Sequence, residues 1–176
     1  QPIGAGSIIN FAESPETVFE NLQEVSPTIF TAVPRVWERI YSRVSIMTSE
    51  ATPFGRWAFK MALAAGMKKI RAEEQNRAIP LTYFFWDFIL LRNIRRMLGM
   101  DNLRRGTTGA APISPELLTW FRAIGVKIFE GYGMSESTGL ISLNYEGNHK
   151  NGSVGTVIPG ASLRIGINDE IQYKGG

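Results

Sequence analysis

Residues 130–139, EGYGMSESTG, bring an aromatic ring, a hydroxyl group and a carboxylate together beside glycines. The Tyr132 ring could stack on a flat heterocycle, and the Ser135 hydroxyl could bond a phosphate oxygen. Glu136 offers a hard oxygen of the kind that Mg²⁺ accepts when substrate phosphates supply further ligands. These residues suggest a nucleoside triphosphate site with its metal. A glycine turn with Tyr132 in the core and Glu136 in water is an equally open interpretation.

Two other interpretations of this stretch fail on its spacing. The run GMSES, residues 133–137, lacks the second glycine of the G-x-S-x-G nucleophile elbow. That fold places the acid before the histidine, whereas Asp169 follows His149, the only histidine of the chain. In a dinucleotide site, Glu136 would replace the third glycine of G-x-G-x-x-G and repel a pyrophosphate. Serine hydrolysis and dinucleotide binding are therefore disfavoured.

A second stretch of small residues, Gly109-Ala110-Ala111-Pro112, follows a candidate strand at 103–108. The overlapping GTTG at 106–109 could cradle a phosphate, but no lysine follows it, so a turn that exposes the backbone is favoured. This stretch and residues 131–133 each follow a strand, with one helix between them. Because such loops meet at the carboxyl ends of the strands in an open α/β sheet, we expect one ligand site built from both.

The composition limits the classes of site that the chain can form. The chain has 176 residues, of which 44% are hydrophobic and 20% charged, as in one globular domain with a core. One histidine and no cysteine exclude disulfides, zinc–thiolate centres and multi-histidine metal sites. No signal peptide is visible, and the most apolar run, residues 79–91, is too short to span a bilayer and contains Asp87.

The net charge of +3 is unevenly distributed. Five arginines fall between positions 92 and 105: Arg92, Arg95, Arg96, Arg104 and Arg105. A solvated helix face is the first interpretation, and a phosphate-rich partner or an anionic membrane surface is the alternative. The apolar and arginine-rich stretch 79–105 therefore supports the hypothesis of a peripheral membrane contact.

Two helix–strand units predict the fold class. Ser14-Pro15-Glu16 and Ser114-Pro115-Glu116 each combine a serine N-cap, a proline at the first helical position and an acid near the positive helix end. The helices lead into a buried strand at 28–33 and a strand at 126–129, and Gly125 ends the second helix. Such units predict an α/β fold with a mainly parallel sheet and flanking helices.

The region between the two units is predicted to be helical. We expect one helix from Pro34 to Val44, a loop at 45–53, a second helix at 54–77, and a third between Pro80 and Gly99. Apolar spacing predicts that the second of these helices turns four side chains inward: Trp57, Met61, Leu63 and Ala64.

After Gly139 the sequence predicts short antiparallel strands. Glycines separate β-prone pieces at 154–158, 162–167 and 170–173. We therefore divide the chain into an α/β subdomain at 1–140 and the truncated start of a small β-rich subdomain at 141–176.

On these motifs the sequence resembles the adenylate-forming (AMP-binding) acyl-CoA synthetases, and most of all the long-chain fatty-acid–CoA ligases. The family's Y-G-x-[ST]-E motif is present at residues 132–136, and its Gly/Ala-rich adenine loop at 109–112. The stretches TIFTAVPRVWERIYSRV and GSVGTVIPGASLRI are also similar to that family, so the resemblance covers essentially the whole chain. It implies that the chain is part of the large N-terminal domain of that fold.

The resemblance also implies roles for individual residues. Tyr132 would stack on the adenine, Ser135 would contact the phosphates, and Glu136 would hold Mg²⁺, which makes Ser135 and Glu136 the catalytic candidates. The residues implied to bind ATP and the acyl-adenylate are Gly109, Ala110, Ala111, Pro112, Glu130, Gly131, Tyr132, Gly133, Met134 and Ser135. Ser135 stands where the family more often has threonine. Trp37 and the aromatic helix 83–88 are better explained as core than as walls of an acyl tunnel.

The family reaction joins a fatty acid and ATP to give acyl-AMP and pyrophosphate, after which CoA displaces AMP. The implied partners are a fatty acid, ATP with Mg²⁺, and CoA as co-substrate, in the cytoplasm and without nucleic acid. The family's phosphate loop, ribose-binding aspartate and lysine-bearing C-terminal domain have no counterpart here, so we expect a piece of a longer ligase that is inactive alone. A ligase for aryl or amino acids and a non-catalytic nucleotide-binding module are the alternatives.

Overall fold

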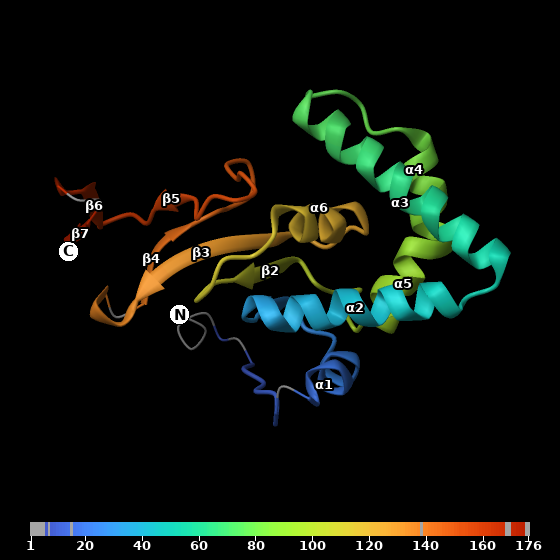
Figure 1. Ribbon diagram of the computed structural model, residues 1–176, viewed down its shortest axis with the longest axis horizontal. Coiled ribbons are helices and arrows are strands. Elements are labelled where there is room, and N and C mark those ends of the chain that lie inside the picture. Colours follow the sequence, from blue (N-terminus) through green and yellow to red (C-terminus); the bar gives the residue numbers. More distant parts are fainter. Residues whose placement is uncertain (1–5, 7, 15, 138, 168–169, 175–176) are drawn as a thin grey trace.

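A five-stranded mixed sheet, in the order β1–β2–β3–β4–β5, organises the structure (Figure 1). The computed structural model describes residues 6, 8–14, 16–137, 139–167 and 170–174. Strands β1, β2 and β3 are parallel, whereas β4 and β5 continue the sheet in antiparallel pairing. The strands are β1 (Ile29–Thr31), β2 (Arg105–Thr108), β3 (Ile128–Met134), β4 (Gly139–Leu143) and β5 (Thr156–Val157). The predicted α/β class is confirmed, with a sheet that is parallel in one part only.

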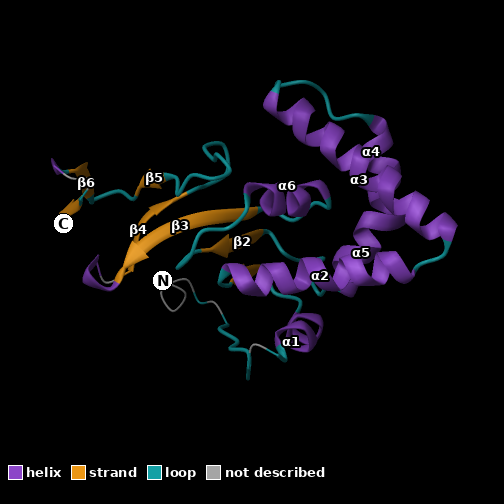
Figure 2. Cartoon of the chain, in the orientation of Figure 1, coloured by secondary structure: helices purple, strands orange, loops and turns teal. Residues whose placement is uncertain are grey.

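A separate antiparallel pair and a set of helices lie at opposite ends of the molecule (Figure 2). The pair consists of β6 (Ser162–Ile165) and β7 (Ile171–Lys174), so the expected antiparallel strands after Gly139 are confirmed. The helical segments are α1 (Val18–Val25), α2 (Pro34–Glu50), α3 (Pro53–Glu74), α4 (Leu81–Trp86), α5 (Arg92–Met97) and α6 (Pro115–Ala123), with a π-helical turn η2 (Asp87–Leu91) and a 3₁₀ turn η3 (Ser135–Ser137). No helix in the described ranges has the length and apolar content needed to cross a membrane.

The helix starts predicted from the sequence are present in part. Ser114 caps α6 by accepting a hydrogen bond from the amide of Leu117 at 3.3 Å, and Gly125 follows the helix with a φ of +90°. Of the other start signal, Pro15 lies outside the described residues, and α1 begins at Val18. The subdomain boundary proposed at residue 140 falls within β4, which pairs with β3; the division into subdomains stays a prediction.

Trp37 of α2 is the centre of the core. Its ring is fully buried and meets Phe30 of β1 and Phe121 of α6 edge-on, with ring centroids 5.1 Å and 5.3 Å away. Its indole N–H donates to the carbonyl oxygen of Ala32 at 3.3 Å, which satisfies the one polar group of the side chain. Trp37 is therefore a core residue, as expected.

Only alternate residues of β1 and β2 face this core. Phe30 lies beside Gly106 in the parallel register and packs on Trp37, whereas Ile29 and Thr31 are exposed. The prediction of a fully buried strand at 28–33 is therefore wrong for the described chain. The reason is that β1 is the edge of the sheet, and the helices cover one of its faces.

Helix α3 packs through small residues rather than through the aromatic residues that the sequence suggested. Its buried positions are Ala62, Ala65, Gly66, Ile70 and Ala72. Trp57 and Met61 are 53% and 40% exposed and Ala64 is exposed, so the predicted inward face is wrong for these three residues. A β-carbon added to Gly66 would lie 2.1 Å from the carbonyl oxygen of Ala123, so the backbones of α3 and α6 are in direct contact.

Two further predictions are corrected by the structure. The loop expected at 45–53 is mostly helix, because α2 continues to Glu50 and α3 starts at Pro53. Thr48 directs its hydroxyl back to the carbonyl oxygen of Val44 at 2.7 Å, which lets a polar residue continue the helix. The aromatic helix 83–88 is not simply core, since Phe84 and Phe88 are largely exposed.

The contact between α3 and α6 can be tested by Gly66→Ala. Alanine normally favours a helix interior over glycine by about 1 kcal/mol. Here the added methyl would collide with the Ala123 carbonyl, and we expect a net loss of roughly 1–3 kcal/mol in the free energy of unfolding. Urea denaturation measures it, with Lys60→Ala on the exposed side of α3 as a near-neutral control. A stabilised Gly66→Ala variant would contradict the close approach.

Candidate functional site

The parallel pairing of β2 and β3 brings the two predicted site segments together. Thr108 at the end of β2 lies beside Glu130 in the register. In the next position a β-carbon on Gly109 would be 2.9 Å from the carbonyl oxygen of Gly131. Residues 109–112 thus leave the carboxyl end of β2 beside residue 131, at the point where the parallel pairing with β3 stops. Ligands bind at this edge of α/β sheets.

Most of the EGYGM segment is strand rather than loop. β3 continues to Met134 because β4 pairs with it, with Tyr132 opposite Ser142 and a register shift between Tyr132 and Gly133. A β-carbon on Gly133 would lie 2.2 Å from the carbonyl oxygen of Gly139, so this position requires glycine for close approach rather than for a turn. The expectation of a loop at 131–133 is therefore wrong, and residues 131–134 are held by pairing with β4.

The turn after β3 presents the two catalytic candidates. Ser135 and Glu136 lie on η3 and are exposed. The buried Ser137 shapes this turn: its hydroxyl accepts the Met134 amide at 3.3 Å and lies 2.8 Å and 2.7 Å from the carbonyl oxygens of Met134 and Gly139. The sequence analysis did not assign a role to Ser137, although a serine just after a strand is a common turn-forming residue.

Tyr132 occupies an intermediate position. Its side chain is half-buried on β3, and its hydroxyl donates to the sulfur of Met134 at 3.9 Å. The ring is not enclosed in the core, and Glu136 is in contact with solvent. This arrangement is compatible with a stacking role for Tyr132, and that role stays a prediction.

The 109–112 segment leaves β2 with a strained backbone. Ala110 has a φ of +67°, a left-handed conformation that costs a residue with a β-carbon about 1–2 kcal/mol. Ala110, Ala111 and Pro112 are exposed, so their backbone is open to a ligand. Strained backbone conformations of this kind are common at functional sites, where contacts with the surrounding structure maintain them.

Buried polar groups lie directly behind the two segments. Glu130 is buried, and its carboxylate accepts a hydrogen bond from the amide of Gly152 at 3.0 Å. Burial raises the pKa of Glu130, and the Gly152 amide offsets this in part. The hydroxyl of Thr108, its partner in the register, is buried without a hydrogen-bond partner among the described residues. These groups were not found from the sequence as a pair, because their adjacency depends on the strand register.

Asn144 joins β3 to the loop that covers Glu130. Its amide donates to the carbonyl oxygen of Glu130 at 2.9 Å. Its side chain accepts from the amide of Lys150 at 3.1 Å and donates to the carbonyl oxygen of Ser153. The loop at 145–153 is thereby fixed to the strand that carries the motif. Asn144 is a second buried residue that the sequence analysis missed.

Among the described residues near the site, the titratable groups form neither a serine–histidine pair nor a preformed metal cluster. Burial, together with the charges of Arg122 and Lys127, lowers the pKa of His149, whose ring stands edge-on to Phe129 at 5.9 Å. In the part of the chain that the structure describes, no three acidic, histidine or cysteine residues are placed to hold a metal ion. Glu136 and the Ser135 hydroxyl are hard oxygen donors, so they fit Mg²⁺ when phosphate oxygens complete its shell.

The buried carboxyl group of Glu130 can be tested through the pH dependence of stability. Because its pKa is higher in the folded chain than in the unfolded chain, its favourable contribution is complete at low pH and is lost as the pH rises through the folded value. We expect Glu130→Gln to raise Tm at pH 7 and to change it little near pH 4. Glu130→Ala should lose roughly 1–3 kcal/mol at both pH values, because the Gly152 amide loses its acceptor.

Thermal unfolding measured by circular dichroism checks this prediction. Glu24→Gln is the matched control, since Glu24 is exposed. If Tm of Glu130→Gln fell at pH 7 as much as that of Glu130→Ala, the carboxylate would be stabilising as an anion, contrary to the expectation.

Comparison with solved structures supports the fold. A benzoate CoA ligase from Burkholderia xenovorans matches with a TM-score of 0.59 and 17% identity, over 99% of this chain and 29% of that protein. The anthranilate CoA ligase AuaEII matches with a TM-score of 0.55 and 16% identity, over 96% of this chain and 26% of that protein. At these identities the similarity establishes the fold, which is that of the N-terminal domain of adenylate-forming enzymes.

Sequence comparison establishes the family. The long-chain-fatty-acid–CoA ligase ACSBG2 of Xenopus laevis is 31% identical over 148 residues, which cover 82% of this chain and 20% of the relative. The long-chain-fatty-acid–CoA ligase FadD15 of Mycobacterium bovis is 30% identical over 173 residues, which cover 96% of this chain and 28% of the relative. The chain thus spans between a fifth and a third of the length of these relatives. Residues 2–174 match the AMP-binding enzyme family, and the chain belongs to that family.

Proposed function

We propose that this chain forms part of the nucleotide site of a long-chain fatty-acid–CoA ligase. The observation that carries the proposal is the close approach of Gly109 to Gly131, which brings the segment after β2 against the part of β3 that carries the second motif. The named relatives at about 30% identity support the choice of substrate class. The reaction would join a fatty acid to ATP with release of pyrophosphate, and CoA would then displace AMP from the acyl-adenylate.

The described residues suit the first step. The open backbone at 109–111 would receive the adenine, with the half-buried Tyr132 ring stacked on it. The exposed Ser135 hydroxyl would bond a phosphate oxygen, and the exposed Glu136 carboxylate would hold Mg²⁺. Mg²⁺ would stabilise the charge that develops as pyrophosphate leaves. The buried pairing of β3 with β2 and β4 would keep these groups in position.

The partners proposed for the whole protein are a fatty acid, ATP and CoA, in the cytoplasm. The stretch 79–105 would add a peripheral membrane contact, and we expect no role for nucleic acid. The isolated chain of 176 residues should not form acyl-AMP, because Ala110, Ala111, Ser135 and Glu136 lie in an open surface that does not exclude water. Detection of acyl-AMP by mass spectrometry after incubating the purified chain with ATP, Mg²⁺ and palmitate would contradict this expectation.

The proposed metal ligand can be tested in the full-length natural protein. We expect Glu136→Ala to slow fatty-acid-dependent pyrophosphate release by roughly 10²–10³-fold, because a group that stabilises developing charge is removed. The measurement is initial rate against Mg²⁺ concentration with acids of increasing chain length. Glu24→Ala, which removes an exposed carboxylate from α1, should leave the rate unchanged. An unchanged rate in Glu136→Ala would rule out the assigned role, and dependence on aryl rather than fatty acids would rule out the substrate class.

A further inference from the structure

The helical stretch 81–97 exposes a row of apolar side chains, while Tyr83 and Leu91 of the same stretch are buried in the core. α4, η2 and α5 follow one another without a break, and α4 and η2 lie beside α3, at the end of the molecule away from the β6–β7 pair (Figure 1). Five apolar side chains on this stretch are between 47% and 84% exposed, and we call them the outer stripe: Leu81, Phe84, Phe85, Phe88 and Ile89. A helix packed on a core normally places such residues inward.

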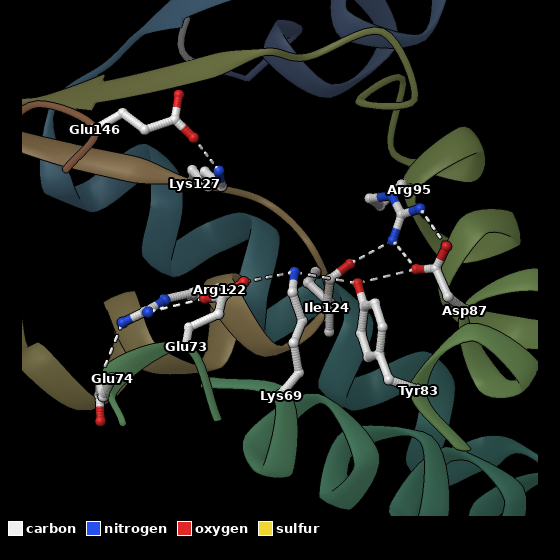
Figure 3. Close-up of polar contacts among 10 residues, drawn as sticks. All are labelled: Lys69, Glu73, Glu74, Tyr83, Asp87, Arg95, Arg122, Ile124, Lys127 and Glu146. Carbon is white, nitrogen blue, oxygen red and sulfur yellow. Dashed lines mark hydrogen bonds and ion pairs between the residues drawn. The ribbon is translucent and has the colours of Figure 1, made fainter. Parts of the chain in front are cut away.

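Three polar side chains of the same stretch, Tyr83, Asp87 and Arg95, contact one another on the side away from the outer stripe and hold its orientation (Figure 3). Arg95 donates to the carboxylate of Asp87 at 2.7 Å and to the carbonyl oxygen of Ile124, at the end of α6, at 2.8 Å. The hydroxyl of Tyr83 donates to Asp87 at 3.2 Å. Burial and the nearby Asp87 carboxylate raise the pKa of Tyr83 to about 12, so this hydroxyl remains a donor at physiological pH.

The π-helical turn makes this inward ion pair possible. In an ideal α-helix, side chains eight residues apart point about 80° away from each other, whereas seven residues bring them to within about 20°. The extra residue in η2 gives Asp87 and Arg95 the geometry of a seven-residue separation. The ion pair between Arg95 and Asp87 therefore holds the outer stripe toward solvent. Loss of Arg95 would leave the Asp87 carboxylate without its cationic partner.

Positively charged side chains follow the outer stripe along the helix. Arg92 and Arg96 follow it on the exposed side of α5, and no carboxylate of the described residues forms an ion pair with either. A surface hollow of about 380 Å³ spans the junction, lined by Phe88, Ile89, Arg92, Asn93 and Arg96. The ring of Phe88 and the guanidinium groups of Arg92 and Arg96 thus line one hollow.

Ring contacts connect the outer stripe to α3: Phe85 stands edge-on to Trp86 at 5.5 Å, and Trp86 contacts Trp57 of α3. Trp57 stands edge-on to Trp86 at 6.0 Å and beside Phe54 at 5.7 Å, and Trp57 and Phe54 are 53% and 74% exposed. Tryptophan and phenylalanine beside arginine are the side chains favoured where a protein meets the boundary between lipid headgroups and acyl chains.

We propose that the outer stripe, with Arg92, Arg96 and Trp57, docks on a membrane surface that contains anionic lipid. The phenylalanines would enter the headgroup–acyl boundary, and the two guanidinium groups would bind lipid phosphates. Charge complementarity favours lipid over a second copy of this chain, whose matching surface would carry the same arginines. This surface specifies the membrane contact proposed above. It does not depend on the ligase reaction, so vesicle binding and pyrophosphate release can fail separately.

The test is sedimentation of the full-length natural protein with vesicles of phosphatidylcholine, prepared with or without about 30% phosphatidylglycerol. The anionic lipid gives the vesicle a surface potential of roughly −30 mV or more negative. We expect retention on the anionic vesicles at low salt and a fall at high salt, where screening shortens the reach of the charges. Arg92→Glu/Arg96→Glu should weaken binding roughly tenfold or more. Phe84→Ser/Phe88→Ser should also release the protein. The matched control is Arg164→Glu/Lys174→Glu, on the exposed β6–β7 pair, which should bind as the wild type does.

Tryptophan fluorescence locates the contact. Brominated acyl chains should quench part of the emission. Trp57→Phe should remove much of this quenching, because Trp37 and Trp120 of this chain are buried and Trp86 is only half-exposed. Circular dichroism confirms that each variant is folded.

Four outcomes would overturn the proposal. The first two are no retention on anionic vesicles, and retention of the Arg92→Glu/Arg96→Glu variant equal to that of the wild type. The other two are displacement by inorganic phosphate at constant ionic strength, and a wild-type dimer that the Phe84→Ser/Phe88→Ser change converts to monomer. The third outcome would indicate a site for soluble anions, and the fourth a self-association surface.

Discussion

The contact between Gly109 and the carbonyl oxygen of Gly131 is the constraint on which the candidate site depends. A β-carbon at position 109 would come within 2.9 Å of that oxygen, so glycine allows the first residues beyond β2 to lie directly against β3. The open segment at 109–112 and the turn at 135–137 are consequently held by one sheet. The strand pairing behind them includes Glu130 and Thr108, whose polar groups are buried.

A second close contact supports this arrangement from the helical side. Gly66 allows α3 to touch the end of α6, and Arg95 binds the Ile124 carbonyl oxygen at the same end. The chain leaves α6 there and enters β3. The position of the motif strand thus depends on two helices that contain none of the motif residues. The residues that could contact a nucleotide are therefore different from the residues that determine their position.

The sequence was sufficient for the features that local rules describe. The Ser114 cap, the α/β class and the meeting of the 109–112 and 131–136 segments follow from capping chemistry and from the topology of parallel sheets. The two glycines of EGYGM were assigned to a loop, whereas they lie in β3 and allow close approach to β4, a partner that is not visible in the local pattern. The inward face of α3 was missed because alanine and glycine carry little hydrophobic signal.

The helix at 81–97 was misjudged for a different reason. Amphipathic patterns are normally interpreted with the apolar side inward, and here Asp87 and Arg95 share the inward side with Tyr83 and Leu91 while a second set of apolar side chains is exposed. The periodicity of the sequence does not show which side of this helix is exposed, because that side is determined by its contacts with α3 and α6. The one-sided cover of β1 is similar, because the sequence of a strand does not say which of its faces another part of the protein will meet.

The π-helical turn at Asp87–Leu91 makes chain length as important as residue type in this region. A deletion of one residue there would restore the regular α-helical winding and rotate everything beyond it by about 100° around the axis. Arg95 would then leave Asp87, and Arg92 and Arg96 would no longer line up with the phenylalanines. In related chains, a conserved spacing between positions 84 and 96 would therefore be a more sensitive marker of this surface than conservation of any single side chain.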